Sequence, residues 1–273
     1  MFLFLDMSNF YFRIMNKLSL VIPFILIYSV VFAQVEKIDT DRPDQTESAN
    51  TVPKKWMQFE LGFLMQTDTY SKKEKDITYQ HPTLLTRYGL TNNFELRLIT
   101  TYGTKLHKNN HISSNRKTGM QSVKVGGKIN IVKEKQWQPT ITLIAHYDIR
   151  RFQTPQHDSV DGANFKISLQ HTLSKKISLG YNLGMEWENF SISPAYTYTI
   201  APGIDFNENW YGYVELFGSI YKNEKPQHRF DAGLAWYAKP DLKFDISAGT
   251  GISKEAAGWY IAVGGSYRFK TGK

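Results

Sequence analysis

Apolar and polar residues alternate along most of this chain with a period of two. Between Met57 and Gln66 every odd-numbered residue is apolar, and most even-numbered residues are polar or glycine. The stretch from Trp259 to Phe269 follows the same pattern. Successive side chains of a β-strand point to opposite faces, whereas a helix would place apolar residues three and four apart. The alternation therefore predicts a sheet with one apolar and one polar surface.

The alternation divides the chain into about twelve segments. Each is close to the roughly 9–11 residues that a tilted strand needs to cross a bilayer. We expect strands at residues 57–68, 83–90, 94–103, 122–132, 139–150, 163–173, 177–187, 195–206, 210–221, 228–237, 242–251 and 259–269.

Short and long links alternate between these segments. The short links are 91–93, 133–138, 174–176, 207–209 and 238–241. The long, polar links are 69–82, 104–121, 151–162, 188–194, 222–227 and 252–258. A closed up-and-down barrel of a Gram-negative outer membrane has this arrangement, with tight periplasmic turns and longer outer loops. The predicted fold is therefore all-β: a closed antiparallel transmembrane β-barrel of about twelve strands with both termini in the periplasm.

A soluble sandwich or a lipocalin-like barrel would also alternate, with its apolar face inward. Three features favour a membrane barrel with a polar lumen. About twelve strands enclose a space too wide for side chains to fill, since about eight already reach that limit. Aromatic residues gather near the strand ends, where interfacial girdles lie. The polar face is also rich in ions, and the predicted lumen-lining residues are Glu60, Arg87, Glu95, Arg97, Lys124, Lys128, Asp148, Lys166, Glu186, Glu215, Arg229, Asp231, Lys243, Asp245 and Arg268.

Composition narrows the class further. The 273 residues are 41% hydrophobic and 21% charged, too apolar for a disordered chain and too polar for a bundle of membrane helices. The absence of cysteine excludes disulfide scaffolds, thiolate zinc sites and cysteine nucleophiles. The net charge of +8 does not indicate a nucleic-acid partner, because the basic residues are scattered and the chain has an export signal.

That export signal is the apolar stretch Leu18–Ala33. Lys17 precedes it, and Val31 and Ala33 place small residues three and one positions before a cleavage point at Gln34. An uncleaved N-terminal anchor is the alternative. We predict a signal peptide over residues 1–33, with translation starting at Met15. The mature chain then has an N-terminal segment over 34–55 and the barrel over 56–273.

The N-terminal segment contains the acidic string DTDRPDQTES at residues 39–48, which is followed by Trp56 and the first alternating strand. This opening resembles that of the Bacteroidetes outer-membrane proteins called "transporter", of the putative meta-pathway of phenol degradation family. The strings LLTRYGLTNNFELR at 84–97 and YVELFG at 213–218 are similar to that family too. The resemblance covers the mature chain and implies an outer-membrane β-barrel that passes small compounds, aromatic or hydrophobic ones included.

Three interpretations of the acidic string compete. It is a solvated periplasmic tail, a lumen plug, or a cation site built from clustered carboxylates. The glycine and distal glutamate of a calcium loop are missing, which disfavours the cation site. In the plug, the acidic residues would pair with inward-facing Arg87, Arg97, Lys124 or Lys128. The candidate plug residues are Asp41, Arg42, Asp44 and Glu47.

Signals for catalysis are weak, and we predict no catalytic residue, no metal and no cofactor. His171 falls on the apolar face of its strand, as in an outer-membrane lipase, but no serine lies two residues away on that face. His107 and His111 are four residues apart in the link 104–121, where the neighbouring lysines and arginines would repel a metal ion. We interpret that link as a basic outer loop suited to the phosphates of lipopolysaccharide.

The predicted function is a passive, porin-like channel for small solutes in contact with outer-membrane lipid and lipopolysaccharide. The inward charges nearly balance in sign, so we expect weak ion selectivity. The alternatives are a non-transporting structural or surface-interaction barrel and a lipid-modifying enzyme.

Overall fold

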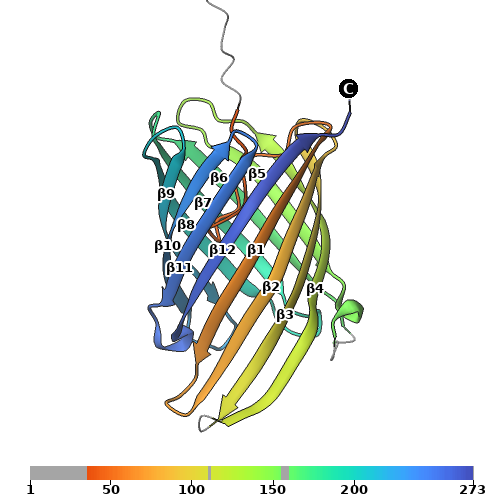
Figure 1. The fold of residues 1–273 in the computed structure, drawn as a ribbon, viewed down its shortest axis with the longest axis vertical. Coiled ribbons are helices and arrows are strands. Elements are labelled where there is room, and N and C mark those ends of the chain that lie inside the picture. Colours follow the sequence, from red (N-terminus) through yellow and green to blue (C-terminus); the bar gives the residue numbers. More distant parts are fainter. Residues whose placement is uncertain (1–35, 110–111, 155–159, 273) are drawn as a thin grey trace, which may run out of the picture. The chain divides into compact units, whose positions relative to one another are not determined.

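The strands form one closed antiparallel barrel in sequence order (Figure 1). The computed structural model describes residues 36–109, 112–154 and 160–272; the predicted signal peptide and His111 lie outside them. Within these ranges the strands are β1 (Trp56–Thr69), β2 (Glu74–Gly89), β3 (Phe94–Asn109), β4 (Ile112–Val132), β5 (Thr140–Asp148), β6 (Gly162–Thr172), β7 (Ile177–Trp187), β8 (Ala195–Asp205), β9 (Trp210–Ile220), β10 (Gln227–Lys239), β11 (Leu242–Gly251) and β12 (Gly258–Lys270).

Closure is made by β1 and β12, which pair from Trp56 opposite Lys270 to Asp68 opposite Gly258. The start of β1 and the end of β12 therefore lie side by side at the end of the barrel that carries the short turns. Two short 3₁₀ helices, η1 (Arg150–Phe152) and η2 (Lys254–Ala256), lie in links at the other end, which we call the long-link end. The predicted twelve-stranded barrel is confirmed. Among the described residues, no helix has both the length and the apolar character needed to cross a bilayer.

Two predicted loops are wrong, because most of links 69–82 and 104–121 is strand. β2 begins at Glu74, which is opposite Asn109 of β3, and β4 begins ten residues before its predicted start. The predicted strand began at residue 83, directly after Pro82, which cannot donate to the ladder. The structure accommodates Pro82 in a register shift between Gln80 and Thr83, and pairing resumes beyond it. His107 therefore lies on β3 rather than in a basic loop.

Side-chain exposure shows which face is inside. Arg87, Lys128 and Glu95 are at most 1% exposed, whereas the outward Leu183 is 57% exposed. Aromatic side chains lie on the outer face at the short-turn end, where Trp210 and Trp236 stack with ring centroids 6.4 Å apart. The barrel thus has its apolar face outward and its polar face inward, the reverse of a soluble sandwich.

An outward cation should destabilise this barrel in proportion to its depth in the membrane. We expect Leu183→Arg, in the middle of β7, to lower the free energy of unfolding by about 2–4 kcal/mol, since a charge at the bilayer midplane is poorly solvated. Leu173→Arg, in the turn after β6, should cost only about 0–1 kcal/mol. Denaturant titration of the barrel in phospholipid vesicles measures both. Equal costs would show that the apolar face does not meet lipid.

Candidate functional site

The polypeptide before β1 lies inside the barrel, where it descends from the short-turn end and returns to β1 (Figure 1). We call residues 37–55 the lumenal segment. Its Ile38 and Val52 are 1% and 2% exposed. The backbone N–H of Ile38 donates to the Pro240 carbonyl at 2.7 Å, and that of Lys55 donates to the Gly89 carbonyl at 2.8 Å. Both ends of the segment are thereby attached to the rim of the short-turn end.

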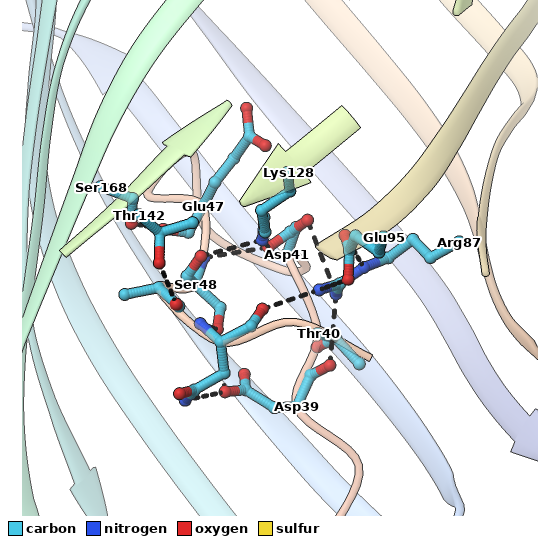
Figure 2. Close-up of polar contacts among 12 residues, drawn as sticks. Asp39, Thr40, Asp41, Glu47, Ser48, Arg87, Glu95, Lys128, Thr142 and Ser168 are labelled. Atoms are coloured by element: carbon cyan, nitrogen blue, oxygen red, sulfur yellow. Dashed lines mark hydrogen bonds and ion pairs between the residues drawn. The ribbon is translucent and has the colours of Figure 1, made fainter. Parts of the chain in front are cut away.

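Asp41 contacts several charged side chains of the wall, and Figure 2 shows it beside Lys128. Its carboxylate is 2.6 Å from the Arg97 guanidinium, 2.8 Å from Lys128 Nζ and 3.6 Å from Arg87. Its backbone N–H donates to Glu60 at 2.9 Å. Burial alone would raise the pKa of Asp41, but the three cations outweigh it and hold that pKa well below its usual range. Asp41 is therefore ionised at neutral pH and is held by cations of β2, β3 and β4.

Glu47 joins the same network six residues later. Its carboxylate is 2.8 Å from both Arg97 and Lys166. Its backbone N–H donates to the Asn182 side chain at 2.7 Å, and its carbonyl accepts from Ser168 at 2.6 Å. Burial opposes ionisation of Glu47, but Lys166 and Arg97 outweigh this effect and lower its pKa. Arg87 belongs to the network as well, because its guanidinium is 2.8 Å from Glu95 and 2.9 Å from Glu60. The network thus joins four cations to four carboxylates: Arg87, Arg97, Lys128 and Lys166 with Asp41, Glu47, Glu60 and Glu95.

Arg42 points to the opposite side, where its guanidinium is 2.9 Å from Asp245 of β11. It lies against Gly62 of β1 and Gly264 of β12, which are opposite each other in register. A Cβ atom at either glycine would overlap the Arg42 side chain. The glycine pair therefore makes the recess that admits this cation. Lys243 of β11 also donates to the Arg42 carbonyl, at 2.6 Å.

The wall of β9 and β10 presents carboxyl groups to the segment. Glu215 and Asp231 are opposite each other in register and are at most 1% exposed. Glu215 accepts from the Gln45 N–H at 2.7 Å and from the Thr46 hydroxyl at 2.5 Å. Burial raises the pKa of the nearby Asp44 to about 8, against the opposing attraction of Lys243. Asp44 therefore carries a proton at neutral pH, unlike Asp41 and Glu47.

The other predicted lumen-lining residues form separate pairs nearer the barrel ends. Lys124 binds Glu186 at 3.1 Å, and Asp148 is 3.1 Å from the Arg150 guanidinium. Two further pairs, at 2.8 and 2.7 Å, are Arg229 with Asp68 and Arg268 with Asp241. The structure thus places these five predicted residues, Lys124, Asp148, Glu186, Arg229 and Arg268, away from the segment network, and a role for each in transport stays a prediction.

Polar cavities lie on both sides of the segment. A cavity of about 660 Å³ opens toward the long-link end and is bordered by Lys124, Asp148 and Glu186. A second of about 400 Å³ lies against Asp41 and Arg42, and a third of about 330 Å³ lies between the segment and the short turns. Glu47 borders all three cavities. The segment therefore divides the lumen into spaces that face opposite ends.

Several neutral polar residues of the site were missing from the predicted lumen-lining residues, which included only the ions of the polar face. His146 accepts a hydrogen bond from Arg97 at 2.9 Å, and Asn182 and Ser168 hold the backbone at Glu47. Thr142 donates to the Ala49 carbonyl. All four occupy inward positions of the predicted strands, so the period-two pattern itself was the signal for them.

His171 lies on the outer surface, as its alternation predicted. Its ring stacks on Tyr181 of β7 with centroids 6.0 Å apart, and the Tyr181 hydroxyl is 3.2 Å from Nε2. A stacked tyrosine at this distance accounts for an imidazole on an otherwise apolar face.

The family model described as "Putative MetA-pathway of phenol degradation" matches residues 40–269. The chain belongs to this family. The match begins within the lumenal segment and ends in β12, so it includes the segment together with the barrel. A comparison with curated proteins finds no match.

Solved structures share the architecture. An outer-membrane channel from Pseudomonas putida F1 superposes with a TM-score of 0.67 and 8% sequence identity, covering 85% of this chain and 100% of that chain. The KdgM porin superposes with a TM-score of 0.48 and 10% identity, covering 77% of this chain and 99% of that one. The CymD monoaromatic hydrocarbon channel superposes with a TM-score of 0.48 and 9% identity, covering 80% of this chain and 89% of that one. The likeness to the Pseudomonas channel shows that this member of the phenol-degradation family has the fold of an outer-membrane channel.

Removing the charge of Asp41 should destabilise the barrel strongly. Asp41→Asn leaves the buried Lys128 without the carboxylate that it contacts and removes one of the three carboxylates around Arg97, so we expect a loss of about 3–5 kcal/mol in the free energy of unfolding. Asp39→Asn is the matched control, because Asp39 contacts Ser48 and Asn50 through hydrogen bonds only. Denaturant titration in vesicles compares the two. Equal losses would show that the ion pairs of Asp41 contribute nothing specific.

Asp44 should make stability fall at alkaline pH. Burial raises its pKa in the folded protein to about 8, well above the ordinary pKa of an aspartate, so protonation of Asp44 favours the folded state. The stability that Asp44 contributes is complete below about pH 4 and is lost as the pH rises through about 8. Denaturant titrations at pH 6 and pH 9 measure this change. The free energy of unfolding should fall more between these two pH values for the wild type than for Asp44→Asn. Identical losses would contradict this assignment.

Proposed function

We propose that this protein is a passive outer-membrane channel for small compounds, aromatic ones among them, whose lumen is controlled by the lumenal segment. The observation that carries the proposal is the continuous polar inner face, with cavities of about 660 and 330 Å³ on the two sides of one short polypeptide. A hydrogen-bonded polar wall replaces the bilayer along the path of a solute. The family's association with phenol degradation supports aromatic compounds as solutes.

Orientation and processing belong to the same proposal. Short turns lie at the periplasmic end of outer-membrane barrels, and Trp56 and Lys270 are opposite each other at the short-turn end of this one. Both termini of the mature chain would then face the periplasm, after removal of the signal peptide at residues 1–33. The Bacteroidetes origin that the opening string suggests also stays a prediction.

Selection by charge would be weak in such a channel. The four cations and four carboxylates of the central network neutralise one another, and Lys124 and Glu186 do the same nearer the long-link end. A solute would meet hydrogen-bonding groups and few uncompensated charges. His171 on the outer wall contacts the Tyr181 hydroxyl at 3.2 Å, and this contact gives no support for an enzymatic function.

A barrel sealed by its own segment is the second candidate function. It is favoured by the attachment of the segment to many strands at once, from Glu60 of β1 to Asp245 of β11. In that case the protein would have a structural or surface-interaction role and would pass no solute.

Permeation measurements separate the two candidates. Liposomes containing the wild type should admit small sugars, amino acids and aromatic acids slowly. Deletion of Asp39–Glu47 should raise permeation and single-channel conductance several-fold, because the wall loses the polypeptide that divides its cavities. The double variant Asp41→Asn/Glu47→Gln keeps the chain length. Its permeation and conductance should lie between those of the wild type and the deletion protein.

Unchanged conductance after the deletion would remove the segment as a plug. If both the wild type and the deletion protein are folded and neither admits any solute, the protein is not a channel. Folding of each variant is checked by its heat-dependent mobility in detergent gels.

A further inference from the structure

Three cationic side chains lie together on the outward face of the extended sheet formed by β2, β3 and β4. Lys75 of β2 is directly opposite Lys108 of β3. Arg116 of β4 is opposite Leu106, two residues before Lys108. No side-chain hydrogen bond or ion pair of these three cations with any described residue is present. This contrasts with the central lumen, where the cations are paired at 2.6–2.9 Å.

The carboxylates of the same strands lie on the inner face. Asp76 is opposite Asp68 in register, and Asp68 lines the lumenal cavity. His107 is 2.7 Å from Asp76 and 3.8 Å from Glu74, which places all three side chains together on the inner side. Among the residues that the structure describes, the outward face of these strands around Lys75 and Arg116 therefore carries positive charge alone. Like charges directly opposite each other destabilise a sheet. The described part of the wall supplies no counter-charge to Lys75 and Lys108, so an anion bound between them would reduce their repulsion.

An apolar groove of about 540 Å³ on the outer surface is lined in part by Arg116. Arg116 and Leu106 form one part of its wall, and Phe63, Met65 and Val263 of β1 and β12 form another. Its size falls within the range of small-molecule sites. A guanidinium at the edge of a lipid-facing apolar groove suits a ligand with an anionic head and a hydrocarbon chain.

We propose that this surface binds lipopolysaccharide, with the phosphates of lipid A between Lys75, Lys108 and Arg116 and one acyl chain in the groove. The proposal rests on the orientation given above, in which the long-link end meets the outer leaflet. Lipid A carries two phosphate groups, whereas a phospholipid such as phosphatidylglycerol carries one. Three clustered cations match the larger charge, and the planar guanidinium can hold a phosphate through two hydrogen bonds.

Lipid titration of the purified, folded protein in detergent, followed by native mass spectrometry, tests the site. The probes are bisphosphorylated lipid A, monophosphoryl lipid A and phosphatidylglycerol. We expect the wild type to bind them in that order of decreasing affinity. The triple variant Lys75→Gln/Lys108→Gln/Arg116→Gln should bind bisphosphorylated lipid A about tenfold more weakly or worse, since it loses every charge-assisted contact to phosphate.

Lys105→Gln is the matched control, because Lys105 is on β3 between the same strands but lines the lumenal cavity. It should leave lipid A affinity unchanged. Met65→Trp should weaken binding by filling the groove while keeping all three cations. If the triple variant does not fold, Arg116→Lys still tests the site, because it keeps the charge and removes the two-fold hydrogen bonding.

Equal lipid A affinity in the triple variant and the wild type would overturn the proposal. So would equal binding of phosphatidylglycerol, which would indicate an unselective anionic-lipid surface. Solute permeation by the triple variant should equal that of the wild type. A loss of lipid binding with normal permeation supports this site alone, and a failure of permeation in both proteins concerns only the proposed channel function.

Discussion

Ionised side chains that face the inside of a closed wall must be paired, and this requirement organises the structure. Lipid contact forces the wall to close, because an unpaired strand edge cannot be solvated in hydrocarbon. The polar face then turns inward, where Arg87, Lys128 and Glu95 are almost completely shielded from solvent. Charges in such surroundings interact strongly and are costly when alone. The wall therefore needs counter-charges at defined places, and the lumenal segment supplies them.

The charges of the segment match an asymmetry of the wall. On the side of β1 to β6, the four network cations exceed the carboxylates Glu60 and Glu95 by two, and Asp41 and Glu47 supply the missing negative charges. On the side of β9 to β11 carboxylates are in excess. There the segment brings Arg42 to Asp245 and presents Asp44 in its protonated form. This complementarity fixes the direction of the segment, because reversing it would place like charges together.

The alternating pattern was enough to predict the barrel, because the apolar face must be continuous over every strand. The acidic string before the first strand identified Asp41, Arg42, Asp44 and Glu47 as candidates but left the choice between a tail, a plug and a cation site open. Deciding which wall cation lies beside Asp41 requires the register between strands, since Arg97 and Lys128 are 31 positions apart in the chain. Register depends on hydrogen bonding between neighbouring strands rather than on any one strand. The extent of β2 to β4 was missed for a related reason, because the polar links 69–82 and 104–121 form strands through pairing with each other, which the polarity of one segment does not reveal.

The chemistry of the segment also bears on how firmly it is held. A buried ion pair gains Coulomb energy but loses the hydration of both partners, so its net contribution is small even where removal of one partner is costly. The many contacts of Asp41 and Glu47 therefore specify one position of the segment more strongly than they stabilise it. The covalent link to β1 at Trp56 keeps a displaced segment at an effective concentration in the millimolar range, which favours its return. Water that enters from the cavities on either side can solvate the exposed wall charges while the segment is displaced. A network of balanced buried pairs thus fixes one position of the segment without adding much to the stability of the fold.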